Sequence, residues 1–298
     1  MELIAENLEK HFGRFAALDK ISFKMKGHGC FGYLGPNGAG KSTTMKIFTT
    51  LLRPNGGNAI INGIDVAKSP TKALMHVGAL VEDPEPYNFM TVKEFITFAA
   101  KIRKIKSVDM KMLNDLLKLP PMDRRCSALS KGQKRRVMIA AIVAQDPDIL
   151  ILDEPSSGLD PAESIIFRDL ILRLKKEKLI FLSSHILYEI TQTCNYIFFI
   201  NNGRIIKSGK TSSFIKKFKS KAIKIAFIDS VPEHAMTSLV HSGLVKDYEK
   251  DGGKNYTLNF DGKDSTRREI IDRVHKFGIR TVEDAQLGLE KAYLDLIK

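Results

Sequence analysis

The chain has 298 residues, 43% of them hydrophobic, and a formal net charge of +13. This length and composition can bury a full core and predict two domains. No apolar run approaches about 18 residues, which argues against a membrane-spanning helix.

The chain start, the cysteines and the basic residues narrow the class further. Residues 1–6 lack the basic and apolar regions of a secretory signal. Cys30, Cys126 and Cys194 are odd in number and form no C-x-x-C pair, which argues against a disulfide framework or a zinc site and fits a reducing cytoplasm. The positive charge is compatible with a nucleic-acid surface or with a protein that faces anionic lipid and binds phosphates. Because no aromatic-interleaved RNA motif accompanies it, we expect no nucleic-acid partner.

A glycine-rich segment near the N-terminus has the pattern of a phosphate-binding loop, G-x-x-x-x-G-K-[ST]. It lies between an apolar strand predicted at 31–34 and a helix predicted at 43–52. Its glycines allow backbone N–H groups to converge on phosphate oxygens at a helix N-terminus. We expect Lys41 to reach the β- and γ-phosphates and Ser42 to bind Mg²⁺. The nucleotide-binding residues predicted here are Gly35, Pro36, Asn37, Gly38, Ala39, Gly40, Lys41, Ser42 and Thr43.

A strand predicted at 76–81 ends at Glu82, whose carboxylate offers a hard oxygen ligand for a metal ion. Residues 83–130 are predicted to form a helical insert, with a first helix at 91–104 and a second at 108–119. The first helix places apolar side chains on one face at helical spacing, namely Val92, Phe95, Ile96 and Ala99.

The segment Leu129-Ser130-Lys131-Gly132-Gln133 leads into a helix predicted at 134–145. The Ser130 hydroxyl, the first backbone N–H groups and the helix dipole together can bind a phosphate. Ser130 is equally explained as an ordinary N-cap. Both roles can hold together.

Two carboxylates follow the apolar segment 149–152, which is typical of a buried parallel strand. We expect Asp153 to hold Mg²⁺ through water and Glu154 to act as general base for the water that attacks the γ-phosphate. The alternative is a strand followed by a solvated acidic loop. A second apolar strand, 179–182, precedes His185, which is either a polar surface residue or a catalytic group.

The order of these motifs resembles the ATP-binding subunit of an ABC transporter. After the P-loop and L-S-x-G-Q come Asp153-Glu154-Pro155, Gly158-Leu159-Asp160 and Ser183-Ser184-His185. The resemblance covers about residues 1 to 215. It implies an α/β fold, in which a P-loop NTPase parallel sheet with an N-terminal antiparallel β-layer and the helical insert fills residues 1–212. In the family the insert faces the membrane partner, which docks near Pro86 to Met90.

The resemblance also implies roles for residues outside the P-loop. The signature residues Ser130, Gly132 and Gln133 bind the ATP of the opposite protomer, so that two ATP molecules are sandwiched head to tail. Asp160 organises the contact between protomers. His185 contacts the γ-phosphate and orients Glu154 and the water.

Three positions differ from the family pattern. Lys131 stands where the family has Gly, and Phe12 stands where a Tyr or Trp usually stacks on adenine, with a core position as the alternative for Phe12. Glu82 stands where a Gln usually touches Mg²⁺ and the attacking water, so its contact with the triphosphate depends on Mg²⁺. The segment around Glu82 is similar in export-type members, including bacitracin-resistance and lantibiotic-immunity groups. This likeness favours export.

The family motifs end near residue 213, and residues 213–298 are predicted to form a C-terminal accessory domain. Strands at 222–228, 244–249, 255–260 and 279–282 and helices at 232–241 and 265–277 give the order βαββαβ, which suggests a small ferredoxin-like α+β unit. A final helix is predicted at 286–297. The alternative for this domain is a packing cap without a ligand.

These observations predict an ATP- and Mg²⁺-dependent motor subunit at the cytoplasmic face of the cell membrane. Its partners would be a polytopic membrane permease, absent from this chain, and a second copy of itself or a related ATPase subunit. The alternative is a soluble ABC-type ATPase that acts on nucleic acid or ribosomes. Such proteins usually carry two motif sets or a long coiled coil, whereas here only a short insert separates Lys41 from Ser130. The transporter is therefore favoured.

Overall fold

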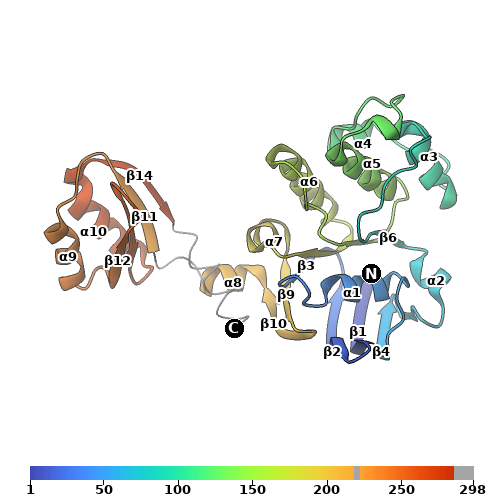
Figure 1. Ribbon diagram of the computed structural model, residues 1–298, viewed down its shortest axis with the longest axis horizontal. Helices are drawn as coiled ribbons and strands as arrows, with labels where there is room; N and C mark the ends of the chain where they lie inside the picture. The colour runs from blue at the N-terminus through green and yellow to red at the C-terminus, as the bar shows by residue number, and fades with distance from the viewer. Residues whose placement is uncertain (218–221, 285–298) are drawn as a thin grey trace. The chain divides into compact units, whose positions relative to one another are not determined.

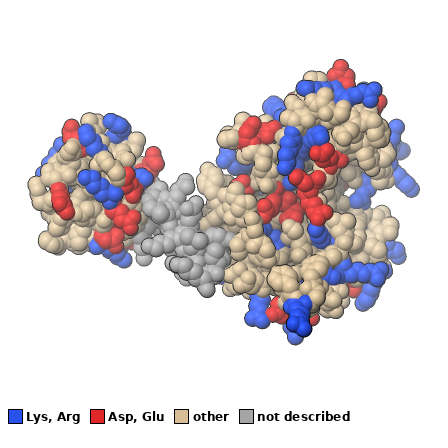
Figure 2. Space-filling view, viewed as in Figure 1, with Lys and Arg blue, Asp and Glu red and all other residues tan. Residues whose placement is uncertain are grey.

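The computed structural model describes residues 1–217 and 222–284 (Figure 1). The chain divides into two compact units, Met1–Thr211 and Ser212–Lys298. Lys and Arg side chains are interspersed with Asp and Glu on both units, on the face that Figure 2 shows. That face therefore carries no continuous basic stripe of the kind that tracks a nucleic-acid backbone.

Short apolar segments form the central sheet of the first unit, in the order β10-β9-β3-β8-β7-β6. Strands β9, β3, β8, β7 and β6 are parallel, and β10 pairs with β9 as an antiparallel edge strand. Every residue of β7 and β8 is buried, as expected for parallel strands covered on both faces. The bounds are β3 Gly29–Leu34, β6 Val77–Leu80, β7 Ile149–Leu152, β8 Leu179–Ser184, β9 Tyr196–Asn201 and β10 Arg204–Lys210.

The predicted antiparallel layer is a four-stranded sheet in the order β2-β1-β4-β5. Its strands are β1 Glu2–Phe12, β2 Phe15–Lys26, β4 Gly56–Ile61 and β5 Ile64–Asp65. Along the second half of β2 buried and exposed residues alternate, so one face enters the core. There Phe23 of β2 packs on Tyr33 of β3 and Phe181 of β8, with ring centroids 5.9 and 5.7 Å apart. This aromatic core fixes the layer against the central sheet.

The helix after the P-loop, α1, spans Lys41–Phe48 rather than the predicted 43–52. It starts earlier because Gly40, at a left-handed φ of 108°, serves as its N-cap. It ends earlier because Thr50 also takes a left-handed φ, 61°, which a helix cannot continue through. The other helices of this part are α2 Pro70–Leu74, α6 Pro161–Leu174 and α7 Leu187–Thr193.

The helical insert contains α3 (Val92–Ile102), α4 (Met110–Leu117) and a 3₁₀ turn at Cys126–Ala128. The predicted apolar face of α3 is buried, comprising Val92, Phe95, Ile96 and Ala99. Helix α5 (Lys131–Val143) packs on α3, α4 and β6, and so connects the insert to the sheet (Figure 1). It starts three residues before the predicted position, because Ser130 and Gln133 form a capping box there.

The second unit has the predicted element order, with an antiparallel sheet arranged β12-β13-β11-β14. One face of this sheet packs on α9 and α10 through Ile225, Leu258, Met236 and Ile270. Strand β12 begins later than predicted, because Leu244 and Val245 belong to the turn before it and still pack into the core. The bounds are α8 Thr211–Lys217, β11 Ala222–Phe227, α9 Glu233–His241, β12 Asp247–Lys250, β13 Asn255–Asn259, α10 Asp264–Val274, a 3₁₀ turn His275–Phe277 and β14 Ile279–Asp284. The helix predicted at 286–297 lies outside the described residues.

Two of the three cysteines meet in the first unit although they are far apart in the sequence. The Sγ atoms of Cys30 and Cys194 lie 3.2 Å apart. All three cysteines are free and buried, and burial raises the pKa of the Cys30 thiol. In the part of the chain that the structure describes, no helix is long and apolar enough to cross a membrane.

Candidate functional site

The predicted site residues follow the carboxyl ends of four neighbouring parallel strands. Strand β3 leads into the P-loop, and β8, β7 and β6 lead into His185, Glu154 and Glu82. These strands lie side by side in the order β3-β8-β7-β6. Since the carboxyl ends of parallel strands share one edge of a sheet, this edge is where a ligand site forms.

The P-loop surrounds Lys41, whose side chain is only 4% exposed. Its ammonium donates hydrogen bonds to the carbonyl oxygens of Gly35 at 2.8 Å and Pro36 at 3.1 Å. Gly40 is required where the loop turns, because a Cβ at this position would lie 2.7 Å from the Ala17 carbonyl oxygen. The backbone of the loop is therefore closely packed around a buried positive charge.

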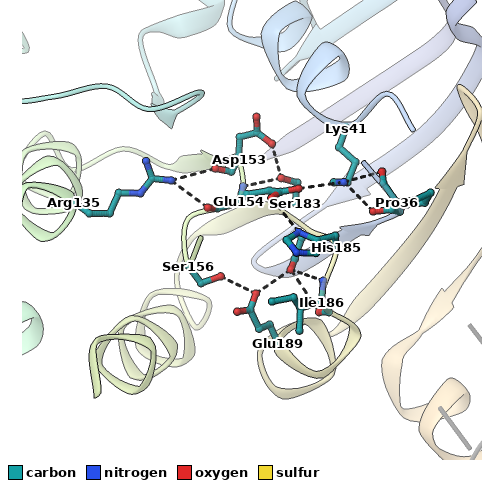
Figure 3. Close-up of polar contacts among 12 residues, drawn as sticks. Pro36, Lys41, Arg135, Asp153, Glu154, Ser156, Ser183, His185, Ile186 and Glu189 are labelled. Atoms are coloured by element: carbon teal, nitrogen blue, oxygen red, sulfur yellow. Dashed lines mark hydrogen bonds and ion pairs between the residues drawn. The ribbon is translucent and has the colours of Figure 1, made fainter. Parts of the chain in front are cut away.

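Glu154 lies between Lys41 and His185 (Figure 3). Its Oε1 atom is 3.2 Å from Lys41 Nζ, and its Oε2 atom is 3.1 Å from His185 Nδ1. The loops that follow three different strands thus bring a carboxylate, an ammonium and an imidazole together. This arrangement suits a base that accepts a proton beside a bound phosphate.

Ser183 links the two carboxylate residues that follow β7. Its hydroxyl donates to Asp153 Oδ1 at 2.6 Å and accepts from the backbone N–H of Glu154 at 2.8 Å. Asp153 is 6% exposed, so this bond also satisfies one oxygen of a buried carboxylate. Ser183 belongs to the motif that ends at His185, and no separate role was predicted for it. A hydroxyl residue at the end of β8 was the available signal.

The residues at this edge fit a Mg²⁺ ion that binds together with a nucleotide. Ser42 offers a hydroxyl in the first turn of α1, and Asp153 offers a buried carboxylate. Among the described residues, no group of three or more His, Cys, Asp and Glu side chains forms a metal cluster. Mg²⁺ in nucleotide sites typically uses one or two carboxylates together with phosphate oxygens. The Ser42 hydroxyl and the Asp153 carboxylate are therefore ligands of the kind that Mg²⁺ uses in nucleotide sites.

Arg135, on α5, reaches the same edge and was not identified from the sequence. Its guanidinium is 6% exposed and donates to the Glu154 and Asp153 carbonyl oxygens at 3.1 and 3.4 Å (Figure 3). Burial lowers the pKa of Arg135, and the charges of Asp83 and Asp153 oppose that shift. Periodicity alone would assign this residue to a solvated helix face, so no local pattern indicates these contacts.

The signature residues form their contacts away from Lys41. Ser130 and Gln133 bond reciprocally, and Asp160 caps α6 in the same way with Glu163. The Glu163 carboxylate lies beside Gly132, where a Cβ would be 2.2 Å from its oxygens. Within residues 1–217 and 222–284, no hydrogen bond or ion pair joins these residues to Lys41 or Glu154. The chain therefore carries the two halves of the predicted site at separate positions.

Comparison with known proteins identifies the family. The family model described as ABC transporter matches residues 18–157. The ABC transporter ATP-binding protein NatA of Bacillus subtilis is 32% identical over 222 residues, which is 72% of this chain and 90% of that protein. The chain belongs to the ATP-binding subunits of ABC transporters. It is accordingly an ATPase whose hydrolysis of ATP is coupled to transport.

Other relatives of this ABC ATPase agree. The Nod factor export ATP-binding protein I of Ralstonia nicotianae is 32% identical over 223 residues, covering 72% of this chain and 68% of that protein. A solved structure titled as the ATP binding subunit of an ABC transporter superimposes with a TM-score of 0.65 at 29% identity. It covers 73% of this chain and 93% of that chain, so the solved fold is reproduced almost in full.

Phe12 of the ABC ATPase lies at the end of β1 and is 50% exposed. The alternative of a core position is therefore wrong. Its ring already has a cation near it, since Lys10 Nζ lies 5.3 Å from the centroid. Stacking of adenine on the exposed ring of Phe12 stays a prediction.

Glu82 lies beside the helix that follows the P-loop. Its side chain is 63% exposed and forms an ion pair with Lys46 of α1. Its backbone takes a left-handed φ of 67°. Glu82 thus enters the site from β6 with its charge partly balanced by Lys46.

Replacement Glu82→Gln tests whether this carboxylate takes part in metal binding. We expect the variant to hydrolyse ATP with a changed Mg²⁺ dependence, because an anionic oxygen ligand is lost. The measurement is ATPase rate against Mg²⁺ concentration at fixed ATP, with Glu85→Gln as a control of equal charge change three residues away. An identical Mg²⁺ titration for wild type and Glu82→Gln would place Glu82 outside the metal site.

Proposed function

We propose that this subunit hydrolyses Mg²⁺-ATP at composite sites between two protomers and thereby drives export through separate membrane subunits. The observation that carries this proposal is the contact of Glu154 with both Lys41 and His185 at the P-loop edge of the sheet. Three motifs that are far apart in the sequence meet there in the arrangement that phosphoryl transfer requires.

Each residue of this group has a distinct task in the proposed mechanism. Lys41 neutralises charge on the β- and γ-phosphates, and the backbone N–H groups of the P-loop bind their oxygens. Glu154 accepts a proton from the attacking water. His185 orients Glu154 through the hydrogen bond to Oε2. Mg²⁺, held by Ser42 and Asp153, would neutralise charge between the β- and γ-phosphates.

The proposed dimer follows from the separation of the two halves of the site. The Ser130 N-cap and the start of α5 offer N–H groups and a favourable dipole for a phosphate. Since Ser130 does not contact Lys41 within one chain, we propose that Ser130, Gly132 and Gln133 serve the ATP bound by the partner protomer, with Asp160 at the contact between protomers. Solved cassettes such as MJ0796, 20% identical, are titled as dimeric.

An exposed aromatic cluster on the insert supports a membrane partner. Tyr87 stacks on Phe89 with ring centroids 5.7 Å apart, and Tyr87 also contacts Phe98. Phe89 is 68% exposed, and Tyr87 is 50% exposed. Exposed apolar clusters of this kind mark interaction sites. We propose that a polytopic permease docks here, which would place the subunit at the cytoplasmic face of the membrane.

The proposal also covers the direction of transport and the division of the chain into domains. Relatives named for Nod factor export and for multidrug transport favour export. We propose that residues 1–212 form the nucleotide-binding domain with its insert at about 83–130. Residues 213–298 would form the ferredoxin-like accessory domain, supported by the βαββαβ order of the second unit.

Replacement Glu154→Gln tests the proposed general base. We expect hydrolysis to slow by at least about 10²-fold while ATP binding is retained, because a base is lost without loss of phosphate contacts. Steady-state ATPase assays and nucleotide titration measure the two effects. The variant should also dimerise on addition of ATP, as seen by size-exclusion chromatography. Unaltered turnover would remove Glu154 from this role.

Mixed dimers test the composite site. Lys41→Ala and Ser130→Arg homodimers should both be inactive, and mixing them should place both changes in one site and leave the other intact. In a Glu154→Gln background, the mixed dimer should retain one nucleotide. Retention of none would contradict the arrangement between protomers, and this readout does not require both sites to turn over.

Replacement Phe89→Ala tests the docking surface. Less membrane protein should co-purify with the variant than with wild type after mild detergent extraction, because exposed aromatic area is lost from the cluster. ATPase activity of the isolated subunit should be unchanged. Ile206→Ala, an exposed apolar residue on β10, is the control. Equal recovery with both variants, or recovery of ribosomal RNA instead of a membrane protein, would contradict the proposal.

A further inference from the structure

Two carboxylate residues of the site have backbone conformations that non-glycine residues seldom adopt. Glu154 has φ 40° and Glu82 has φ 67°, both in the left-handed region. Each follows the end of a strand, β7 or β6, and these two strands are adjacent. Such conformations persist only where the surrounding structure fixes them. The contacts made by the backbone of these two turns therefore bear on where both carboxylates lie.

Arg135 contacts both turns at once. Its Nη2 atom donates to the carbonyl oxygens of Glu154 and Asp153 at 3.1 and 3.4 Å, and Nε donates to Pro155 at 3.3 Å. Its Nη1 atom donates to the Glu82 carbonyl oxygen at 3.4 Å. The planar guanidinium thus joins the backbone after β7 to the backbone after β6.

The remaining contact of Arg135 is an ion pair with Asp83, 3.1 Å long. Asp83 is 68% exposed and also pairs with Lys131 at 3.1 Å. The charge of Asp83 partly offsets the burial of the Arg135 guanidinium, but this exposed side chain does not hold the backbone after β7 or β6. The four carbonyl contacts are the part of the arrangement that determines backbone geometry.

We propose that Arg135 is a positioning residue for hydrolysis: it holds Glu154 and Glu82 in their left-handed conformations and so directs both carboxylates toward the bound nucleotide. The proposal rests on the role of Glu154 as general base. It also connects the proposed site for the partner's ATP with the chain's own site, because α5 carries Ser130 at its start and Arg135 further along. A shift of α5 that follows ATP binding to the partner protomer would move the backbone of Glu154 in this protomer.

Arg135→Gln and Arg135→Lys test the proposal in the full chain. We expect Arg135→Gln to lower kcat by roughly 10²-fold, the scale of an approximately 1 Å misplacement of a catalytic group. Nucleotide affinity should be unchanged, because Lys41 and the P-loop remain intact. Arg135→Lys should recover part of kcat, since one ammonium donates to fewer carbonyl oxygens than a guanidinium.

Arg103→Gln is the matched control. Arg103 also joins a helix to backbone carbonyl oxygens, donating to Val77 at 2.8 Å and to Met75, but it lies away from the catalytic residues. A merely structural role for Arg135 predicts that both variants lower the melting temperature and leave kcat intact. Asp83→Asn removes the ion pair and keeps the carbonyl contacts, so it should leave kcat near the wild-type value.

Combination with Glu154→Gln separates this inference from the proposed function. If Arg135 acts through Glu154, the double variant should be no slower than Glu154→Gln alone. Multiplied losses in the double variant, a wild-type kcat in Arg135→Gln or Arg135→Lys, or a loss in Asp83→Asn equal to that of Arg135→Gln would each overturn the inference. If instead Glu154→Gln itself keeps wild-type turnover, the assigned base is wrong.

Discussion

The parallel order of β3, β8, β7 and β6 is the constraint on which the site depends. Because these strands run in the same direction and are paired in register, the residues that follow them meet at one edge. Lys41, His185 and Glu154 come from separate loops and are brought together by this edge. The aromatic core of Phe23, Tyr33 and Phe181 fixes the antiparallel layer against the same strands.

Charge in this edge is balanced by contacts from several elements. Glu154 is neutralised by Lys41, and Glu82 is paired with Lys46 of α1. Asp153 is satisfied by the Ser183 hydroxyl, and Arg135 brings a positive charge from α5. In addition, Glu189 accepts hydrogen bonds from Ser156 and Ser184, which ties the loop after β7 to the end of β8 (Figure 3). The loops are thus held by polar contacts, of which those of Asp153 and Arg135 are buried.

Helix α5 carries two residues that face different parts of the chain. Ser130 is its N-cap. Arg135, little more than a turn later, contacts the backbone of Glu154 in the loop after β7. The Glu163 carboxylate of α6 lies beside Gly132 and forms an ion pair with Arg136, so the start of α5 contacts the start of α6. Helix α5 therefore contacts both the start of α6 and the backbone beside Glu154.

The order of the elements and the family could be predicted from the amino-acid sequence alone. The P-loop, the apolar strands and the βαββαβ order of the second unit follow from local patterns of glycine, apolar and polar residues, and these predictions agree with the structure. Helix ends were displaced by a few residues, because capping at Gly40 and Ser130 and the left-handed Thr50 decide them. Other features became visible only in the folded chain: the contacts of Ser183 and Arg135, the pairing of Glu82 with Lys46, the exposure of Phe12 and the contact of Cys30 with Cys194. Each of these depends on side chains from segments that are distant in the sequence, and no local pattern records which distant segments become neighbours in the fold.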